Sequence, residues 1–142
     1  MHEPAPQLQV PQWVTMTTVV AAIIERDGRI LICRRRADGA HPLKWEFPGG
    51  KVEPGEQPVD ALRRELLEEL AIAANIGTEV TRYEYTYPGS KPILLIFYRV
   101  TEFSGEPHNR VFHEIAWDEP VRLCAYDFLD GDVEFVRTLA IR

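Results

Sequence analysis

The sequence predicts an α+β fold in which a mixed β-sheet is sandwiched between helices, in α/β/α layers. Residues 13–25 and 93–100 are rich in apolar and β-branched residues, which is typical of buried strands. Residues 58–70 repeat apolar side chains three and four positions apart, which indicates an amphipathic helix. Phe135, Val136 and Leu139 form a second helical stripe near the C-terminus.

Length and composition fit one globular domain. The chain has 142 residues, of which 45% are hydrophobic, and this suits a single domain with its own core. We assign the domain to residues 13–142 and interpret residues 1–12, rich in proline and glutamine, as a flexible lead-in. A net charge of −6 argues against binding to a nucleic-acid polymer.

The two cysteines and the lack of long apolar runs indicate where the protein works. Cys33 and Cys124 are far apart with no CxxC pattern, so reduced thiols in a cytoplasmic protein are the simplest account. No run of 18 apolar residues is present, which predicts no membrane span, and the N-terminus lacks the pattern of a secretory signal. We expect a monomer or homodimer that binds a small molecule.

Turn residues divide the chain into its remaining elements. Asp27-Gly28 marks a hairpin, so residues 29–36 should return antiparallel to residues 13–25. Residues 37–44 are expected to be a loop, and residues 45–51 an extended segment leading toward the helix. Beyond the helix we expect a turn at 73–77, strands at 79–87, 93–100 and 111–117, loops at 102–110 and 126–132, and then the C-terminal helix.

The predicted central helix carries a cluster of acids. Glu65, Glu68 and Glu69 are spaced to share one helix face. Adjacent carboxylates repel one another, and a hard divalent cation, which prefers oxygen ligands, removes that repulsion. The alternative is a solvated acidic face with ion pairs to neighbouring arginines. The Pro48-Gly49-Gly50 break and the acidic loop just upstream favour the metal-binding interpretation.

Residues 50–72 resemble the Nudix box, G-x5-E-x7-R-E-U-x-E-E-x-G-U, where U is aliphatic. Gly50, Glu56, Arg64-Glu65-Leu66, Glu68-Glu69 and Ile72 all stand at the spacing of the box. The one departure is Ala71, where the family has a glycine that would end the helix in a left-handed conformation. Alanine in that conformation costs on the order of 1 kcal/mol.

The resemblance implies the Nudix fold over roughly residues 14–141 and a site for Mg²⁺, with Mn²⁺ as the alternative. Glu65, Glu68 and Glu69 would be ligands, together with the backbone carbonyl of Gly49. The resemblance groups Arg64 with these glutamates as catalytic and makes Glu69 or Glu65 the base that deprotonates water. Gly50 and Glu56 are expected just outside the ligands, with Glu56 pairing with Arg64 to steady the carboxylates.

The resemblance also implies substrate contacts from Arg35, Phe47, Lys51 and Asp132. Arg35 is matched to a phosphate-binding arginine of MutT-like members, although a run of arginines is also typical of a solvated strand end. Phe47 shares a strand face with Trp45. Each of these two aromatic residues is expected to pack in the core or to line the pocket for the nucleobase. Asp132 is matched to a residue that reads the base edge, and a helix N-cap explains it equally.

Two other positions are less directly matched to the family. His41 is expected to be an exposed loop histidine. Many MutT-like enzymes carry an additional glutamate where this chain has Val111, and Glu106 and Glu114 are the nearest acids.

The resemblance therefore implies a MutT-like nucleoside triphosphate pyrophosphohydrolase. Its reaction would be metal-dependent hydrolysis of (deoxy)nucleoside triphosphates, oxidised or otherwise modified ones among them, to a monophosphate and pyrophosphate, for nucleotide pool sanitation. One rival is a Nudix enzyme for another diphosphate-linked substrate, such as ADP-ribose, a nucleotide sugar or a dinucleoside polyphosphate. The other is a nucleotide-sensing module without catalysis, against which the complete set of box carboxylates argues.

Overall fold

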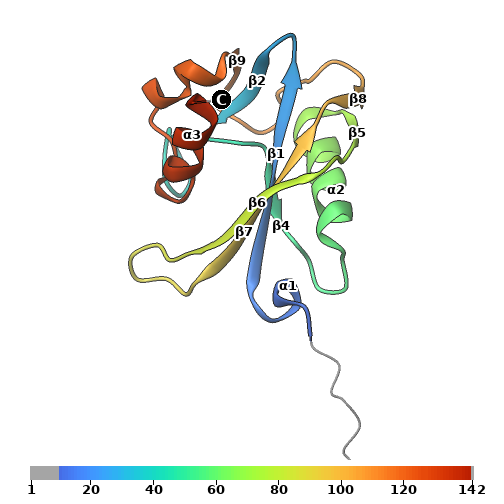
Figure 1. The fold of residues 1–142 in the computed structure, drawn as a ribbon, viewed down its shortest axis with the longest axis vertical. Helices are drawn as coiled ribbons and strands as arrows, with labels where there is room; N and C mark the ends of the chain where they lie inside the picture. Colours follow the sequence, from blue (N-terminus) through green and yellow to red (C-terminus); the bar gives the residue numbers. More distant parts are fainter. Residues whose placement is uncertain (1–9, 142) are drawn as a thin grey trace, which may run out of the picture.

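The computed structural model describes residues 10–141, so residues 1–9 of the predicted lead-in lie outside the described residues (Figure 1). The helices are α1 (Gln12–Thr15), α2 (Pro58–Leu70) and α3 (Val133–Ala140), with two 3₁₀ turns, η1 (Pro120–Ala125) and η2 (Asp130–Asp132). The strands are β1 (Thr17–Arg26), β2 (Arg29–Arg34), β3 (Trp45–Glu46), β4 (Gly49–Lys51), β5 (Ala73–Asn75), β6 (Glu79–Tyr85), β7 (Ile93–Val100), β8 (Glu102–Ser104) and β9 (Glu114–Asp118).

Strand β1 lies at the centre of a mixed sheet with the order β3-β2-β1-β7-β6. It pairs antiparallel with β2 across the predicted Asp27-Gly28 turn, and parallel with β7 along eight residue pairs. β4 also pairs with β1, and β9 pairs with β2, while β5 and β8 form a separate two-stranded sheet. The predicted mixed sheet is confirmed.

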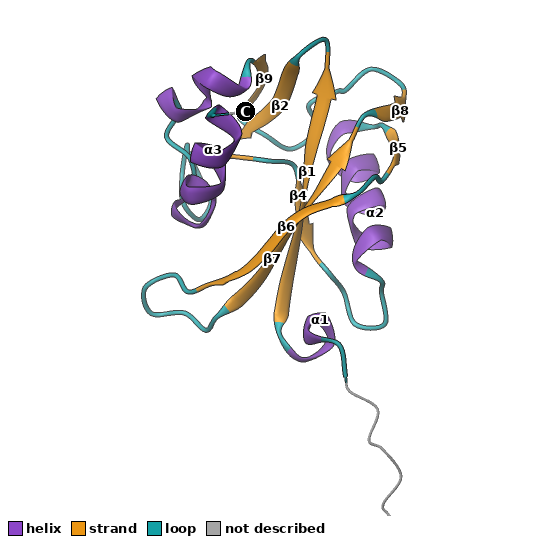
Figure 2. Cartoon of the chain, viewed as in Figure 1, coloured by secondary structure: helices purple, strands orange, loops and turns teal. Residues whose placement is uncertain are grey.

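Helices cover both faces of this sheet. Alternate residues of a strand point to opposite sides, so β1 contributes side chains to the core on each face. Val20, Ala22 and Ile24 of β1 belong to the core cluster that contains the apolar face of α2. Ala21 and Ile23 belong to the cluster that contains α3. Figure 2 shows the two helices on opposite sides of the strands, so the predicted α/β/α layering is confirmed.

Helix α2 carries the acid cluster and ends as a glycine-capped helix would. Ala71 follows its last residue in the left-handed conformation, with φ 59° and ψ 31°, and its N–H donates to the carbonyl of Leu67. The loop after β8 covers the same end, where the amides of His108 and Arg110 donate to the carbonyls of Leu70 and Glu69. The cap geometry of the family is retained without its glycine.

The first strand is shorter than predicted. Residues 12–15 form the helical turn α1 after Pro11, and the Gln12 side chain donates to Glu84 at 2.8 Å. The prediction of a strand from residue 13 was therefore wrong for its first residues. β2 also ends at Arg34 instead of residue 36, and the last predicted strand begins at Glu114 instead of residue 111.

Two short strands replace a predicted turn and loop. Ala73–Asn75 pairs antiparallel with Glu102–Ser104, in segments where we expected no strand. Segments of three residues are too short to show a hydrophobic period, so the pairing could not be predicted from pattern.

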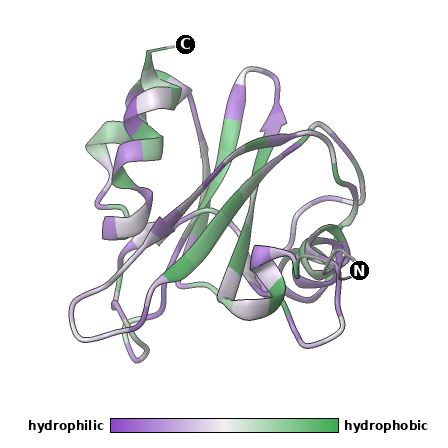
Figure 3. Ribbon diagram, turned by 60° about the horizontal axis from the view of Figure 1, so that its bottom comes forward, coloured by the Kyte–Doolittle hydropathy of each residue, from purple (hydrophilic) through white to green (hydrophobic). Residues whose placement is uncertain are grey.

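Hydrophobic stretches follow the central strands, where both halves of the core lie (Figure 3). Between residues 10 and 141, no helix combines the length and apolar character that crossing a membrane requires.

Candidate active site

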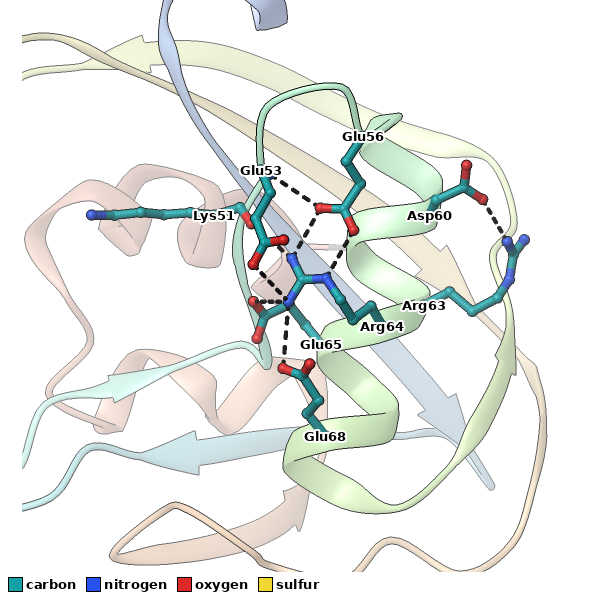
Figure 4. A network of polar contacts seen from close by, with 8 residues as sticks. All are labelled: Lys51, Glu53, Glu56, Asp60, Arg63, Arg64, Glu65 and Glu68. Atoms are coloured by element: carbon teal, nitrogen blue, oxygen red, sulfur yellow. Dashed lines mark hydrogen bonds and ion pairs between the residues drawn. The ribbon is translucent and has the colours of Figure 1, made fainter.

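Arg64 of α2 is the centre of a polar network (Figure 4). Its Nε and Nη2 donate to the two carboxylate oxygens of Glu56 at 2.8 and 3.0 Å, which makes a bidentate pair. Its Nη1 donates to Glu65 at 3.0 Å and to Glu68 at 3.4 Å, and Nη2 also donates to the carbonyl of Lys51 at 3.2 Å. The guanidinium therefore ties the acidic loop to the helix and holds Glu65 in place.

Glu65 and Glu69 lie one helical turn apart, against the Gly49–Gly50 segment. The N–H of Gly49 donates to Glu69 at 3.2 Å, and a Cβ on Gly50 would come 2.5 Å from the carboxyl carbon of Glu65. Burial raises the pKa of both glutamates, and the charge of Glu65 raises the pKa of Glu69 further. Two neighbouring carboxylates that are costly to ionise form a site that a cation would stabilise.

The donor set of this site fits a hard divalent ion, since all its side-chain donors are carboxylate oxygens. Glu65 and Glu69 are already paired, whereas the Glu68 side chain is 58% exposed and lies against Arg64. Within residues 10–141, no three acidic, histidine or cysteine side chains already stand together as a metal-binding group. Glu68 would have to turn from Arg64 toward its neighbours to complete a set of three.

A cavity of about 300 Å³ opens beside the two glycines. Its wall is largely apolar, and Arg35, Glu46, Lys51 and Asp132 place polar groups at its edges. Its apolar lining comes from Val19, Val20, Ala21, Phe47, Ile93, Leu95 and Leu129. All four residues predicted to contact substrate, Arg35, Phe47, Lys51 and Asp132, line this one cavity.

Phe47 and Trp45 have different surroundings in the structure, and only Phe47 lines the cavity. Phe47 lines the cavity while its ring also packs on Phe97 and Phe128, so it belongs to both the core and the pocket. Trp45 is buried against Tyr126, with ring centroids 4.9 Å apart, and does not line the cavity. Of the two aromatic candidates for a base pocket, Phe47 is the one in position.

Asp132 is 6% exposed and faces the cavity. It precedes α3, but its side chain makes no capping hydrogen bond, so the N-cap interpretation of its side chain was wrong. Burial, and then the charge of Glu46, raises the pKa of Asp132 to about 7. The hydroxyl of Tyr83 donates to the carbonyl of Gly131, and the N–H of Gly131 donates to the hydroxyl of Tyr87 at 3.1 Å. These two hydrogen bonds fix the turn that positions Asp132.

Arg35 is the member of the arginine run that reaches the cavity. Arg34 pairs with Glu114 at 3.1 Å and Arg36 with Asp38 at 3.1 Å. Arg35 donates through Nη1 to Glu46 at 2.7 Å and through Nε to the carbonyl of Ala40 at 2.9 Å. The predicted phosphate-binding guanidinium is therefore partly engaged by protein groups.

Sequence reasoning missed Glu46 and the rim of the cavity. Glu46 is a charged residue between the buried Trp45 and Phe47, and that position was the only signal it gave. His41 is exposed, as expected, yet it lines the cavity and packs on Tyr87 with ring centroids 5.0 Å apart. This contact joins residues far apart in the chain, so no local pattern could reveal it.

The position of the additional family glutamate is apolar here. Val111 lines a second cavity, of about 250 Å³, together with Glu46 and Glu69. Glu106 pairs with Arg26 at 2.9 Å and Glu114 with Arg34, and neither lines this cavity.

Comparison with known proteins agrees with this geometry. A family model described as NUDIX domain matches residues 14–138. The chain is 38% identical to the CTP pyrophosphohydrolase of Escherichia coli (strain K12) over 128 residues, which cover 89% of this chain and 94% of that protein. It is also 38% identical to the 8-oxo-dGTP diphosphatase of Haemophilus influenzae over 122 residues, which cover 85% of this chain and 89% of that protein.

Solved structures agree with these relatives. The solution structure of the Escherichia coli ORF135 protein matches with a TM-score of 0.78 at 38% identity, covering 86% of each chain. A MutT structure from a study of the Aliivibrio salmonicida and Vibrio cholerae proteins matches with a TM-score of 0.74 at 29% identity, covering 88% of this chain and 97% of that one. The chain therefore belongs to the Nudix family, among its MutT-like pyrophosphohydrolases.

Proposed function

We propose that this protein hydrolyses nucleoside triphosphates, ordinary or modified, to a nucleoside monophosphate and pyrophosphate. One observation carries the proposal: Gly49 and Gly50 line the cavity and also touch Glu69 and Glu65. A base in the cavity would therefore leave its phosphates beside the carboxylate pair. The names of relatives that act on CTP and 8-oxo-dGTP support the same substrate class.

Nudix hydrolases generally use divalent metal ions, and we propose Mg²⁺ here, with Mn²⁺ as the alternative. Glu65, Glu68, Glu69 and the carbonyl of Gly49 would hold it. When bound, such an ion neutralises phosphate charge and lowers the pKa of water. Arg64 would act as a positioning residue, because its hydrogen bonds go to the loop and to the ligands themselves.

The chain's own groups supply the remaining chemistry. Glu69 or Glu65 would accept the proton of the attacking water. Phe47 and the apolar wall would hold the base, and Asp132 would hydrogen-bond to its edge. Arg35 and Lys51, at the polar edge of the cavity, would contact phosphate oxygens.

The test is release of pyrophosphate with Mg²⁺ across a substrate panel. The panel contains the common NTPs and dNTPs, 8-oxo-dGTP, 5-methyl-dCTP, ADP-ribose and a dinucleoside tetraphosphate. We expect conversion of at least one triphosphate to its monophosphate, and no conversion in the presence of a chelator. Cleavage of ADP-ribose or the dinucleotide alone would move the function to another Nudix substrate class. Binding of nucleotide without any cleavage would indicate a sensing module.

Glu69→Gln tests the metal site, with Asp60→Asn as the matched control. Asp60 lies on the same helix and pairs with Arg63 at 2.8 Å, outside the cavity (Figure 4). We expect E69Q to lose at least about a hundredfold in kcat and D60N to retain wild-type turnover. Wild-type turnover in E69Q would exclude the proposed metal site.

A further inference from the structure

The ion pair between Arg35 and Glu46 lies in a wall shared by two cavities. Both residues line the cavity of about 300 Å³ that faces Asp132 and the cavity of about 250 Å³ that faces Glu69 and Val111. A nucleotide bound as proposed would pass its phosphates along this wall. The pair is therefore placed to affect substrate binding as well as folding.

The geometry of the pair leaves one of the three guanidinium nitrogens of Arg35 without an acceptor in the described part of the chain. Nη1 of Arg35 lies 2.7 Å from one oxygen of Glu46 and 3.3 Å from the other, while Nε is bound by the carbonyl of Ala40 at 2.9 Å. Nη2 donates to no group within residues 10–141. Two protein acceptors thus fix the plane of the guanidinium and leave one nitrogen available to a ligand.

The carboxylate of Glu46 is energetically unfavourable at this position because it is largely removed from water and lies near other acids. Its side chain is only 15% exposed, and two further acids, Glu69 and Asp132, are close enough for their charges to interact with it. A partly buried ion pair of this kind often adds little net stability, because the desolvation cost offsets the attraction. Fold stability is therefore a weak explanation for a glutamate here.

We propose that Glu46 is a positioning residue for substrate binding, which holds Arg35 so that its open nitrogen donates to a phosphate of the nucleotide. This rests on the proposed function, since it presumes a nucleotide in the cavity. Glu46 acts only through Arg35. Removing Glu46 should therefore weaken substrate binding in the same way as removing Arg35, and the two effects should not add.

The test is a double-mutant cycle on KM, using the triphosphate that the panel identifies. We expect Arg35→Ala and Glu46→Ala each to raise KM by about tenfold to a hundredfold, with kcat changed by less than about threefold. Glu46→Gln, which keeps an acceptor for Nη1, should recover part of the loss. The double variant R35A/E46A should have the KM of R35A alone.

The matched control is Asp127→Asn. Lys44 and Asp127 form an ion pair of 2.8 Å near the same strand, but neither residue lines either of these two cavities. D127N should leave KM and kcat unchanged. Melting curves of every variant show whether it folds, and E46Q carries the comparison if E46A does not.

The outcomes separate this inference from the proposed function. Absence of triphosphate hydrolysis by the wild type overturns the proposed function itself. If the wild type is active and R35A has an unchanged KM, the guanidinium does not bind substrate and the inference is wrong. If R35A and E46A raise KM additively, or if E46A lowers kcat alone, Glu46 does not act through Arg35 and the inference is equally wrong.

Discussion

Asp132 is an acid in a largely apolar cavity, and its ionisation should appear in the stability of the protein. Burial and Glu46 raise its pKa from 3.8 to about 7, so between these values the folded state binds the proton more tightly than the unfolded state. The contribution of Asp132 to stability is therefore present at low pH and is lost as pH rises toward 7. It amounts to at most about 4 kcal/mol at about 1.4 kcal/mol per pKa unit.

The variant Asp132→Asn removes this dependence. We expect D132N to match the wild type in melting temperature at or below about pH 4, to exceed it increasingly from there to about pH 7, and to keep a constant lead above that pH. Thermal unfolding at several pH values checks this. Parallel curves for the two proteins would contradict the assignment of this titration to Asp132.

The titration of Asp132 should also affect which nucleobase the enzyme prefers. A neutral carboxyl offers one donor and one acceptor, which match N3 and the N4 amino group of cytosine, whereas an ionised carboxylate offers only acceptors, which match the N–H groups of guanine. The ratio of kcat/KM for CTP to that for GTP should rise as pH falls from 8 to 6. In D132N, whose amide does not titrate, the ratio should stay constant. A wild-type ratio that is also constant would exclude Asp132 as the reader of the base.

Glu69 is a proposed metal ligand whose burial should lower the stability of the metal-free protein. Burial and the charges of Glu65 and Glu46 raise its pKa, so its ionised form destabilises the metal-free fold. In chelator at pH 8, E69Q should melt at least about 3 °C higher than the wild type, which corresponds to about 1 kcal/mol for a domain of this size. Differential scanning fluorimetry measures this, and a lower melting temperature for E69Q would contradict it.

At the scale of elements, the end of α2 offers a direct test of backbone strain. Ala71 adopts φ 59° and ψ 31°, where a side chain is strained and glycine is not. Ala71→Gly should gain about 0.5–1 kcal/mol of unfolding free energy in urea. Ala61→Gly, inside the same helix, should lose about 1 kcal/mol or more. A destabilised A71G would show that the loop after β8 depends on the alanine methyl group.

Elements long enough to show a clear hydrophobic pattern were predictable from sequence, and short or irregular elements were not. The apolar spacing of residues 58–70 predicted the buried face of α2, and the apolar, β-branched run of residues 13–25 predicted a buried strand. Side chains of both elements lie in the core. The pairing of β5 with β8 depends on three residues on each side, and α1 replaces the start of a strand whose apolar residues, such as Trp13 and Met16, still pack on the core. In such segments tertiary contact decides the conformation.

The site shows the same division. The box spacing placed Glu65 and Glu69 on one face, and a helix needs nothing else to bring them together. Glu46 depends on Arg35 across a strand pair, and the His41 contact with Tyr87 depends on two separate loops. Contacts of that kind follow from how the sheet is assembled, which no single stretch of sequence encodes.

At the scale of the molecule, the two cores should unfold together. β1 and β7 contribute side chains to both, so loss of either core removes the other's support. Ile23→Ala, on the α3 side, and Ile24→Ala, on the α2 side, should each lower stability by about 2–5 kcal/mol in a single transition. Tryptophan fluorescence comes from Trp45 in the α3-side cluster and from Trp13 and Trp117 packed against the α2-side cluster, and it should report the same midpoint as circular dichroism. Separate midpoints would show two independent units.

The Gly49–Gly50 segment limits how this enzyme can be re-engineered. A Cβ on Gly49 would fall 1.9 Å from the carbonyl oxygen of Val20, and one on Gly50 would collide with Glu65. Mutagenesis libraries for new substrates should therefore leave these two codons unchanged, because a side chain at Gly49 would clash with backbone and one at Gly50 would displace the Glu65 carboxylate. His41, Tyr87 and Leu129 on the cavity rim are the positions where diversity can be sampled without disturbing the carboxylate pair.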